Sequence, residues 1–513
     1  MPGARGRVRG WPDLPVTPGR LRTNIAANAL GTGVTALAGL LAAPLVYRAL
    51  GPEGYGLVGV YLLLQGLMPL FDLGITPGLA RAIAWHRGRG QPGAVPTLIR
   101  LAHVPMAVVA AAFVLTMLAA AVPIAEGWLR PQALSTGDVA LALVLMSLAL
   151  SLRLLGALNR AALMAMEMQA KANLAQAVAA TARTFGALGV AYATDTGVIG
   201  FLVAQIPVSA IEWWWCAHLL RPSMPGQATP VARAELVAHA RFALGIAGLA
   251  ALWLLASQVD RLLLSIMLSL DDYGRYSLAV HVAAIVALGV SAIHAAALPR
   301  LTRLFAAGEL GRARLLYGLT TALTVATAGA LLSGLATAGP IWLPRLAGLD
   351  GAGLDPMPVA LAYAVGQSGL AVLGLAYLLQ SARGRLRLHA MVTILHTTAV
   401  VPLVLFLANR GVLPMAIGIA LVHWFFVLAW MPIAHRRHLE AGHLRWLQKD
   451  LLPSLVAACA MGILLASVGA NIHGDWAIAM VSVVGAGMVF AVACAAHAGL
   501  RAEALAWSRR RHA

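Results

Sequence analysis

Long apolar segments follow one another along almost the whole chain, separated by basic residues or by short turns rich in Gly and Pro. A helix that crosses the hydrocarbon core of a bilayer needs roughly 20 mostly apolar residues, and each segment is about long enough. Charged residues make up only 11% of the chain, whereas they make up about 25% of a soluble domain. The sequence therefore predicts fourteen membrane-spanning helices, with approximate limits 24–47, 55–80, 101–123, 137–158, 172–193, 196–219, 242–268, 273–298, 315–339, 357–380, 388–408, 411–434, 451–470 and 476–498.

The distribution of basic residues predicts the orientation of these helices. If the N-terminus is cytoplasmic, 30 of the 37 Lys and Arg residues fall at the two termini and in every second connection. Five fall in the outside connections, and Arg183 and Arg261 fall within spans. Cytoplasmic connections of membrane proteins carry such an excess of basic residues. We therefore expect both termini in the cytoplasm, and we attribute the net charge of +18 to this bias and not to nucleic-acid binding.

An internal repeat appears when the chain is shifted by 218 residues. Tyr55-Gly56 then coincides with Tyr273-Gly274, and Glu53 coincides with Asp271. Each copy follows one long apolar span and precedes another whose predicted cytoplasmic end is basic. Parallel repeats are a transporter architecture in which the substrate site lies between the two halves and rocking of the halves gives alternating access.

The fold class that follows is an all-α integral membrane protein with about fourteen transmembrane helices. We expect two pseudo-symmetric six-helix lobes and a C-terminal helix pair. The predicted parts are a basic cytoplasmic N-terminal segment, an N-lobe, a C-lobe, the additional helix pair and a basic cytoplasmic tail, at residues 1–23, 24–220, 236–435, 451–498 and 499–513. Because no connection is long enough to form a separate domain, we expect the function to reside in the helix bundle.

Motifs in both halves give the chain a family resemblance. They are Leu50-Gly51, Tyr55-Gly56, Asp72-Leu73-Gly74, Gln258-Val259-Asp260-Arg261, Tyr273-Gly274-Arg275-Tyr276-Ser277 and Pro299-Arg300-Leu301-Thr302-Arg303. With them the chain resembles the polysaccharide flippases of the multidrug/oligosaccharidyl-lipid/polysaccharide exporter superfamily, in particular the O-antigen and exopolysaccharide repeat-unit flippases. Lipid II flippases of that superfamily carry an arginine cluster in and after the first helix. This chain has Asn24 and Asn28 in its first helix, which disfavours lipid II as the cargo.

The resemblance implies a function, a location and partners. Its members move polyprenyl-diphosphate-linked oligosaccharides from the inner to the outer leaflet of the bacterial cytoplasmic (inner) membrane, for the assembly of lipopolysaccharide or exopolysaccharide. The expected partners are the lipid-linked oligosaccharide, the bilayer, and a glycan polymerase or other assembly proteins.

Two arginines within predicted spans are the first candidates for substrate binding. Arg183 and Arg261 lie one in each half of the chain. Ionisable groups inside a bilayer usually face a cavity or a partner, and guanidinium groups can bind the oxygens of a diphosphate in bidentate fashion. The alternative for Arg183 is an ion pair between helices, and the alternative for Arg261 is a local pair with Asp260.

Further candidates are carboxylates and amides. Asp260 either neutralises Arg261 or carries a coupling ion, and Asp72 is a second candidate for coupling, with a helix-end role as its alternative. Amide side chains can bond sugar hydroxyls or bond neighbouring helices. The amide candidates for substrate binding are Asn24, Asn28, Gln176 and Gln258.

Two other functions remain open from the sequence. One is a cation-coupled drug or small-molecule antiporter of the same superfamily, for which Asp72 and Glu212 are the candidate carboxylates in the N-terminal half. The other is a membrane-embedded glycan polymerase or ligase, which needs catalytic residues in a sizeable outside loop that this chain lacks. The chain has no phosphate-binding loop, no GxSxG elbow and no HExxH motif. We therefore expect a protein that is not an enzyme, with no catalytic residues, metal site or cofactor.

Overall fold

The fold of the described residues is entirely helical. The computed structural model describes residues 18–224, 228–351, 353–439, 442–469 and 474–501, without most side chains of residues 18–40 and several between 238 and 256. Lipid offers no hydrogen-bond partners, so the backbone groups of a membrane-spanning segment must bond to one another. A single segment achieves this only as a helix. Each of the fourteen predicted spans falls on helix, and eleven helices of the described part are long and apolar enough to cross a membrane. The predicted fold class is confirmed.

The first half of the chain contains seven α-helices and two short π-helical segments. The π-helical segments are η1 (Ala125–Leu129) and η2 (Ala182–Gly186). The α-helices are α1 (Pro18–Phe71), α2 (Ile75–Gly88), α3 (Ala94–Ile124), α4 (Thr136–Ala165), α5 (Gln169–Thr181), α6 (Ala187–Thr194) and α7 (Gly197–Leu220).

The second half continues with ten α-helices after the short 3₁₀ turn η3 (Arg221–Ser223). They are α8 (Arg233–Met267), α9 (Leu270–Ala283), α10 (Ile285–Ala306), α11 (Leu310–Ala347), α12 (Pro356–Ala382), α13 (Arg387–Ala408), α14 (Val412–His438), α15 (His443–Trp446), α16 (Leu452–Gly469) and α17 (Asp475–Ala496). A π-helical segment, η4 (Leu447–Leu451), joins α15 to α16.

Two breaks divide the first 88 residues into spans. Helix α1 is kinked at Gly51, which has φ 72° and ψ 175°, a conformation open to glycine but not to other residues. Pro52 follows at the first position of the new helical segment, where proline is well tolerated. The second break is the turn of residues 72–74 between α1 and α2, so the second predicted span consists of the end of α1 and the start of α2.

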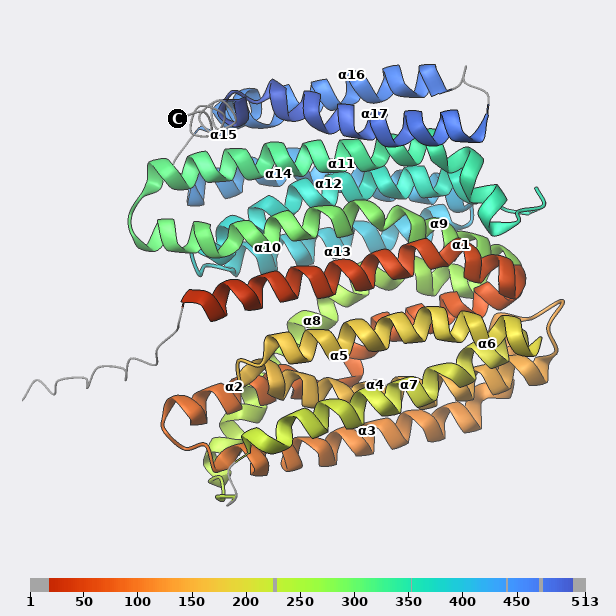
Figure 1. The fold of residues 1–513 in the computed structure, drawn as a ribbon, viewed down its shortest axis with the longest axis vertical. Helices are drawn as coiled ribbons and strands as arrows, with labels where there is room; N and C mark the ends of the chain where they lie inside the picture. The colour runs from red at the N-terminus through yellow and green to blue at the C-terminus, as the bar shows by residue number, and fades with distance from the viewer. Residues whose placement is uncertain (1–17, 225–227, 352, 440–441, 470–473, 502–513) are drawn as a thin grey trace, which may run out of the picture.

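The helices form two groups that lie side by side (Figure 1). We use "N-lobe" for α3 to α7 with the adjoining parts of α1 and α2, and "C-lobe" for α8 to α14. Helices α4 and α7 pack together in the N-lobe, and α12 and α14 pack together in the C-lobe. The hairpin of α16 and α17 packs on the outer side of α11 (Figure 1). The residue limits of the two lobes stay a prediction.

The two repeat segments meet at the boundary between the lobes, where α1 packs closely against α9. A Cβ atom at Gly56 would overlap the backbone carbonyl oxygen of Leu270, and one at Gly274 would overlap the backbone carbonyl oxygen of Pro52. Since Gly56 and Gly274 coincide in the internal repeat, the contact is nearly symmetric. We call this contact the glycine seam. Glycine is required there because the two backbones touch.

An acidic residue near each side of the seam holds a loop at the same end of the bundle. The Glu53 carboxylate accepts hydrogen bonds from the backbone N–H groups of Gln132, Ala133 and Leu134, at 2.7, 2.9 and 2.8 Å. In the other half, the Asp272 carboxylate accepts a hydrogen bond from the backbone N–H of Leu354 at 3.0 Å. Each carboxylate therefore ties the start of a seam helix to a loop of its own half.

Candidate functional site

Three cavities follow one another from the N-lobe to the C-lobe. The N-lobe cavity has a volume of about 270 Å³, the junction cavity about 280 Å³ and the C-lobe cavity about 550 Å³. Gln65 and His281 line both of the first two cavities. Arg261 and Val280 line both the junction cavity and the C-lobe cavity. The shared walls place the three cavities on one path between the lobes.

The N-lobe contains a cluster of three arginines and one glutamate. Glu212 of α7 is 4% exposed and bridges two of the arginines. One of its oxygens lies 2.5 Å from the Arg183 guanidinium, and the other lies 2.7 Å from the Arg160 guanidinium. Arg183 also lines the N-lobe cavity. Arg183 therefore forms an ion pair with another helix and also faces the cavity, so both interpretations of this residue from the sequence apply.

The third arginine, Arg153, lines the same cavity without a carboxylate partner. Its guanidinium donates to the Gln65 side-chain oxygen at 2.6 Å and to the Tyr61 hydroxyl at 3.3 Å. Among the described residues, no carboxylate lies within ion-pair distance of it. Because the cluster contains three arginines and one glutamate, it carries an excess of positive charge beside a cavity.

The helical path turns Arg183 toward this cavity. Arg183 lies in the π-helical segment η2 between α5 and α6. Such segments insert an extra residue into a helix and occur frequently at functional sites. The Gln205 side chain of α7 donates to the backbone oxygen of Arg183 at 2.9 Å, which fixes the segment against α7.

Arg261 lies at the wall between the junction cavity and the C-lobe cavity. Its guanidinium donates to the Gln258 side-chain oxygen at 3.4 Å. Gln258 itself lies against Gly66 of α1, across the boundary between the lobes. No carboxylate of the described part lies within ion-pair distance of Arg261, so the structure does not pair it with Asp260.

Asp260 is instead held by two tyrosines of the C-lobe. The hydroxyls of Tyr276 and Tyr363 both donate to its Oδ2 atom, at 3.0 and 2.5 Å. The side chain is 7% exposed and lines the C-lobe cavity. A carboxylate in this position is a hydrogen-bond acceptor at the cavity wall.

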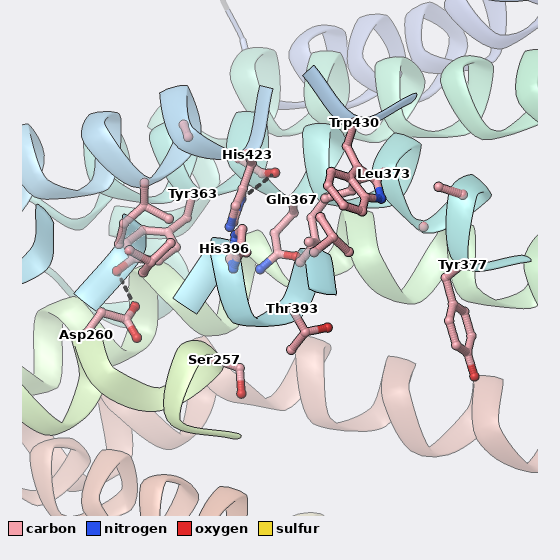
Figure 2. Close-up of a pocket in the computed structure, with 18 of the residues that line it drawn as sticks. Ser257, Asp260, Tyr363, Gln367, Leu373, Tyr377, Thr393, His396, His423 and Trp430 are labelled. Atoms are coloured by element: carbon pink, nitrogen blue, oxygen red, sulfur yellow. Dashed lines mark hydrogen bonds between the residues drawn. The ribbon is translucent and has the colours of Figure 1, made fainter. Parts of the chain in front are cut away.

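The C-lobe cavity is lined by histidines, amides and aromatic side chains (Figure 2). His396 and His423 stack with their ring centroids 5.2 Å apart, and His423 Nδ1 hydrogen-bonds to the backbone oxygen of Gly366 at 3.0 Å. In Figure 2 the Asp260–Tyr363 pair lies on one side of these histidines and Trp430 on the other. The chemistry of this cavity thus differs from the cationic N-lobe cavity.

The remaining predicted site residues have different positions. Gln176 lines the N-lobe cavity. Asp72 accepts hydrogen bonds from the backbone N–H and the hydroxyl of Thr76, and so caps the start of α2. Asn24 and Asn28 belong to α1, but their side chains lie outside the described residues.

Sequence reasoning missed Arg153, Arg160 and Glu212 as a group. Arg153 and Arg160 lie near the predicted cytoplasmic end of the span at 137–158, where basic residues are expected from topology alone. They are seven residues apart in α4, which places them on one face of the helix, and this spacing was the available signal. Glu212 lies 52 residues from Arg160, so no local pattern connects them.

The family of the chain follows from a sequence comparison. The profile of the family described as "Polysaccharide biosynthesis protein" matches residues 21–305. This chain belongs to that family. No curated protein matches the sequence.

Solved structures show the same fold at low identity. The lipid II flippase MurJ in an inward closed conformation is 10% identical with a TM-score of 0.67, over 90% of this chain and 97% of MurJ. An inward-facing multidrug resistance MATE family transporter of the MOP superfamily is 15% identical with a TM-score of 0.64, over 78% of this chain and 94% of the transporter. A MOP superfamily transporter from Pyrococcus furiosus Vc1 (DSM3638) is 15% identical with a TM-score of 0.55, over 83% and 96% of the two chains.

Family and fold together identify the general class of this protein. It is a multi-pass membrane protein of the polysaccharide biosynthesis family, and its fold is that of the MOP superfamily of flippases and transporters.

Proposed function

We propose that this protein moves polyprenyl-diphosphate-linked oligosaccharide units from the inner to the outer leaflet of the bacterial cytoplasmic membrane by alternating access. The transported units would serve the assembly of lipopolysaccharide or exopolysaccharide at the cell surface. Both termini are proposed to be cytoplasmic. The lobes would rock about their boundary, and the path of three cavities would hold the cargo.

The observation that carries this proposal is the excess positive charge of the N-lobe cavity. Arg183 shares the Glu212 carboxylate with Arg160, and the half-buried Arg153 has no carboxylate partner among the described residues. The cavity wall therefore carries uncompensated positive charge that favours an anionic ligand. A diphosphate offers several oxygens in the geometry that guanidinium groups bind in bidentate fashion. Gln176 and Gln65 line the same cavity and can donate further hydrogen bonds. Arg261, which lies farther along the path, is proposed as a second cation for the headgroup.

The proposal is tested by replacing Arg153. Arg153→Gln keeps a hydrogen-bonding side chain but removes the charge, so we expect transport of a fluorescent polyprenyl-diphosphate oligosaccharide into proteoliposomes to fall about 10- to 100-fold, since a hydrogen bond to a charged group contributes about 1.5–3 kcal/mol. Arg300→Gln is the matched control, because Arg300 is exposed and lines none of the three cavities. Equal transport by both variants would refute the proposal.

A second candidate function is cation-coupled drug antiport. One observation favours it: the C-lobe cavity is large, is lined by aromatic side chains and contains the Asp260 carboxylate, a combination that suits a lipophilic organic cation. Asp260 would then serve as the coupling or cation-binding group. A deletion strain that becomes sensitive to cationic drugs while its surface polysaccharide stays unchanged would favour this function over the flippase.

A further inference from the structure

The C-lobe cavity has unpartnered polar atoms in its wall. Gln380 Oε1, His396 Nε2 and Trp430 Nε1 are buried and have no hydrogen-bond partner among the described residues. All three residues line this one cavity. Gln380 is 0% exposed and Trp430 is 6% exposed, so bulk solvent does not satisfy them.

Such a group of atoms indicates a polar ligand. Buried polar atoms in native proteins nearly always have a partner, and an exception calls for an explanation such as a ligand or bound water. The group includes a hydrogen-bond donor and a hydrogen-bond acceptor: the Trp430 indole N–H can only donate, and the Gln380 oxygen can only accept. A ligand that satisfies both must carry groups that donate and accept, as hydroxyls do.

The Asp260 carboxylate adds an acceptor to the same wall. Both tyrosine hydroxyls donate to its Oδ2 atom, and Oδ1 receives no hydrogen bond from the described residues. Because Asp260 lines the cavity, Oδ1 is available to a hydroxyl of a ligand. A carboxylate at this place repels an acidic ligand group and tolerates a neutral one.

The rest of the lining suits a sugar ring. Tyr377 and Trp430 provide aromatic surfaces, and Gln367 and Thr393 provide amide and hydroxyl groups (Figure 2). Arg261, which also lines the junction cavity, is the one Lys or Arg among the described lining residues. At about 550 Å³, the cavity has the size of pockets that enclose small organic ligands, roughly 300–1,000 Å³.

We propose that the C-lobe cavity is a saccharide subsite that binds an uncharged sugar residue of the lipid-linked cargo. This inference rests on the proposed function and assigns the two ends of the headgroup to different lobes. The diphosphate lies with the arginines of the N-lobe, and a neutral hexose or N-acetylhexosamine lies with Asp260, Gln380 and Trp430.

The test compares two lipids on the full-length protein in nanodiscs. The probes are undecaprenyl diphosphate and undecaprenyl-diphosphate-linked N-acetylglucosamine. Trp430→Phe removes the unpartnered indole N–H and keeps an aromatic ring. Gln380→Leu removes the unpartnered Oε1 atom together with the Nε2 group, which donates to the Ala376 backbone oxygen at 3.1 Å. We expect each to weaken binding of the sugar-bearing lipid about 5- to 10-fold, the size of one hydrogen bond, and to change binding of the sugar-free lipid less than about twofold.

A stability measurement separates this role from a structural one. Gln380→Leu removes a buried oxygen without a partner, and the Ala376 carbonyl that loses the Nε2 hydrogen bond keeps its helical hydrogen bond within α12. The ligand-free variant should therefore have a higher Tm than the wild-type protein. Thr397→Val is the matched control: Thr397 is buried in α13 next to His396, its hydroxyl is satisfied by the Thr393 backbone oxygen, and it does not line the cavity. We expect this variant to bind both lipids as the wild type does.

The outcomes distinguish failure of the subsite from failure of the proposed function. If both lipids bind equally well and neither cavity variant changes this, the subsite is refuted while diphosphate binding stands. If neither lipid binds, the proposed function fails and the subsite with it. If the cavity variants weaken binding of tetraphenylphosphonium but not of the sugar-bearing lipid, the cavity is a site for organic cations and the saccharide inference is overturned.

Discussion

At the scale of single residues, Glu212 decides the charge of the N-lobe site. It contacts Arg160 and Arg183 at once, so its carboxylate balances part of the arginine charge while no anion is bound. A diphosphate carries more charge than this one carboxylate. We therefore expect the cargo to compete with Glu212 for Arg183, and Glu212 to keep the empty cavity stable.

Replacing Glu212 tests this balance. In Glu212→Gln two arginines lose their carboxylate, and removing one partner of a buried ion pair costs about 3–5 kcal/mol. We expect a lower Tm of the ligand-free protein together with tighter binding of undecaprenyl diphosphate. The double variant Glu212→Gln/Arg183→Gln should recover most of the Tm and lose the tight binding. A Tm equal to that of the wild type in the single variant would contradict this role.

The sequence could indicate some of these residues and not others. Arg183 and Arg261 were recognisable because charges inside apolar segments are rare, and both line cavities. Glu212 was recognisable as a carboxylate, but its partners come from two other elements and can only be found in three dimensions. The local pair of Asp260 with Arg261 was a reasonable expectation from adjacency, yet the two side chains bond to different neighbours.

At the scale of helices, the apolar pattern predicted the elements because lipid leaves few alternatives. A segment of about 20 apolar residues must be helical in a bilayer, and all fourteen segments are. The pattern did not predict the π-helical segment at Arg183, which depends on packing against α7. The pattern also did not predict that the two copies of the Tyr-Gly motif bring their backbones into contact. A repeat in the sequence does not show whether its two copies lie next to each other in the fold.

The glycine seam gives a prediction about helix contact. Gly56→Ala places a methyl group against the Leu270 carbonyl oxygen, so α1 and α9 must separate. We expect increased labelling of a cysteine at position 277, in a background without native cysteines, by a membrane-impermeant maleimide added outside intact cells. Gly189→Ala is the control, since a Cβ there meets no atom within 4 Å. Unchanged labelling in Gly56→Ala would show that the seam does not close this end of the bundle.

At the scale of the whole molecule, the arrangement agrees with an even number of crossings. Helix α1 begins and α17 ends at the same end of the bundle (Figure 1). The loops between α2 and α3, α10 and α11, and α12 and α13 also lie at that end, and these are the basic connections. The alternation of charge predicts that this end is cytoplasmic, and it is a global pattern that the loss of one span would disrupt.

Reporter fusions test this orientation directly. Fusions after Arg89, Arg312, Arg385 and Arg511 should report a cytoplasmic location, because the basic connections stay on the side of synthesis. Fusions at Leu134 and Gly351 should report the outside. Two or more reporters on the opposite side would refute the proposed topology.

In the proposed orientation, the loop held by Glu53 lies outside the cell and can be recognised by binders raised against intact cells. Three consecutive backbone N–H groups, of Gln132, Ala133 and Leu134, are fixed by one carboxylate of α1. A nanobody against this loop would therefore meet a surface that is already ordered, and ordering a loop is one of the main entropic costs of binding. Since the loop is tied to α1 close to the glycine seam, such a nanobody would follow the movement of that helix, and a labelled version would report on transport from outside the cell.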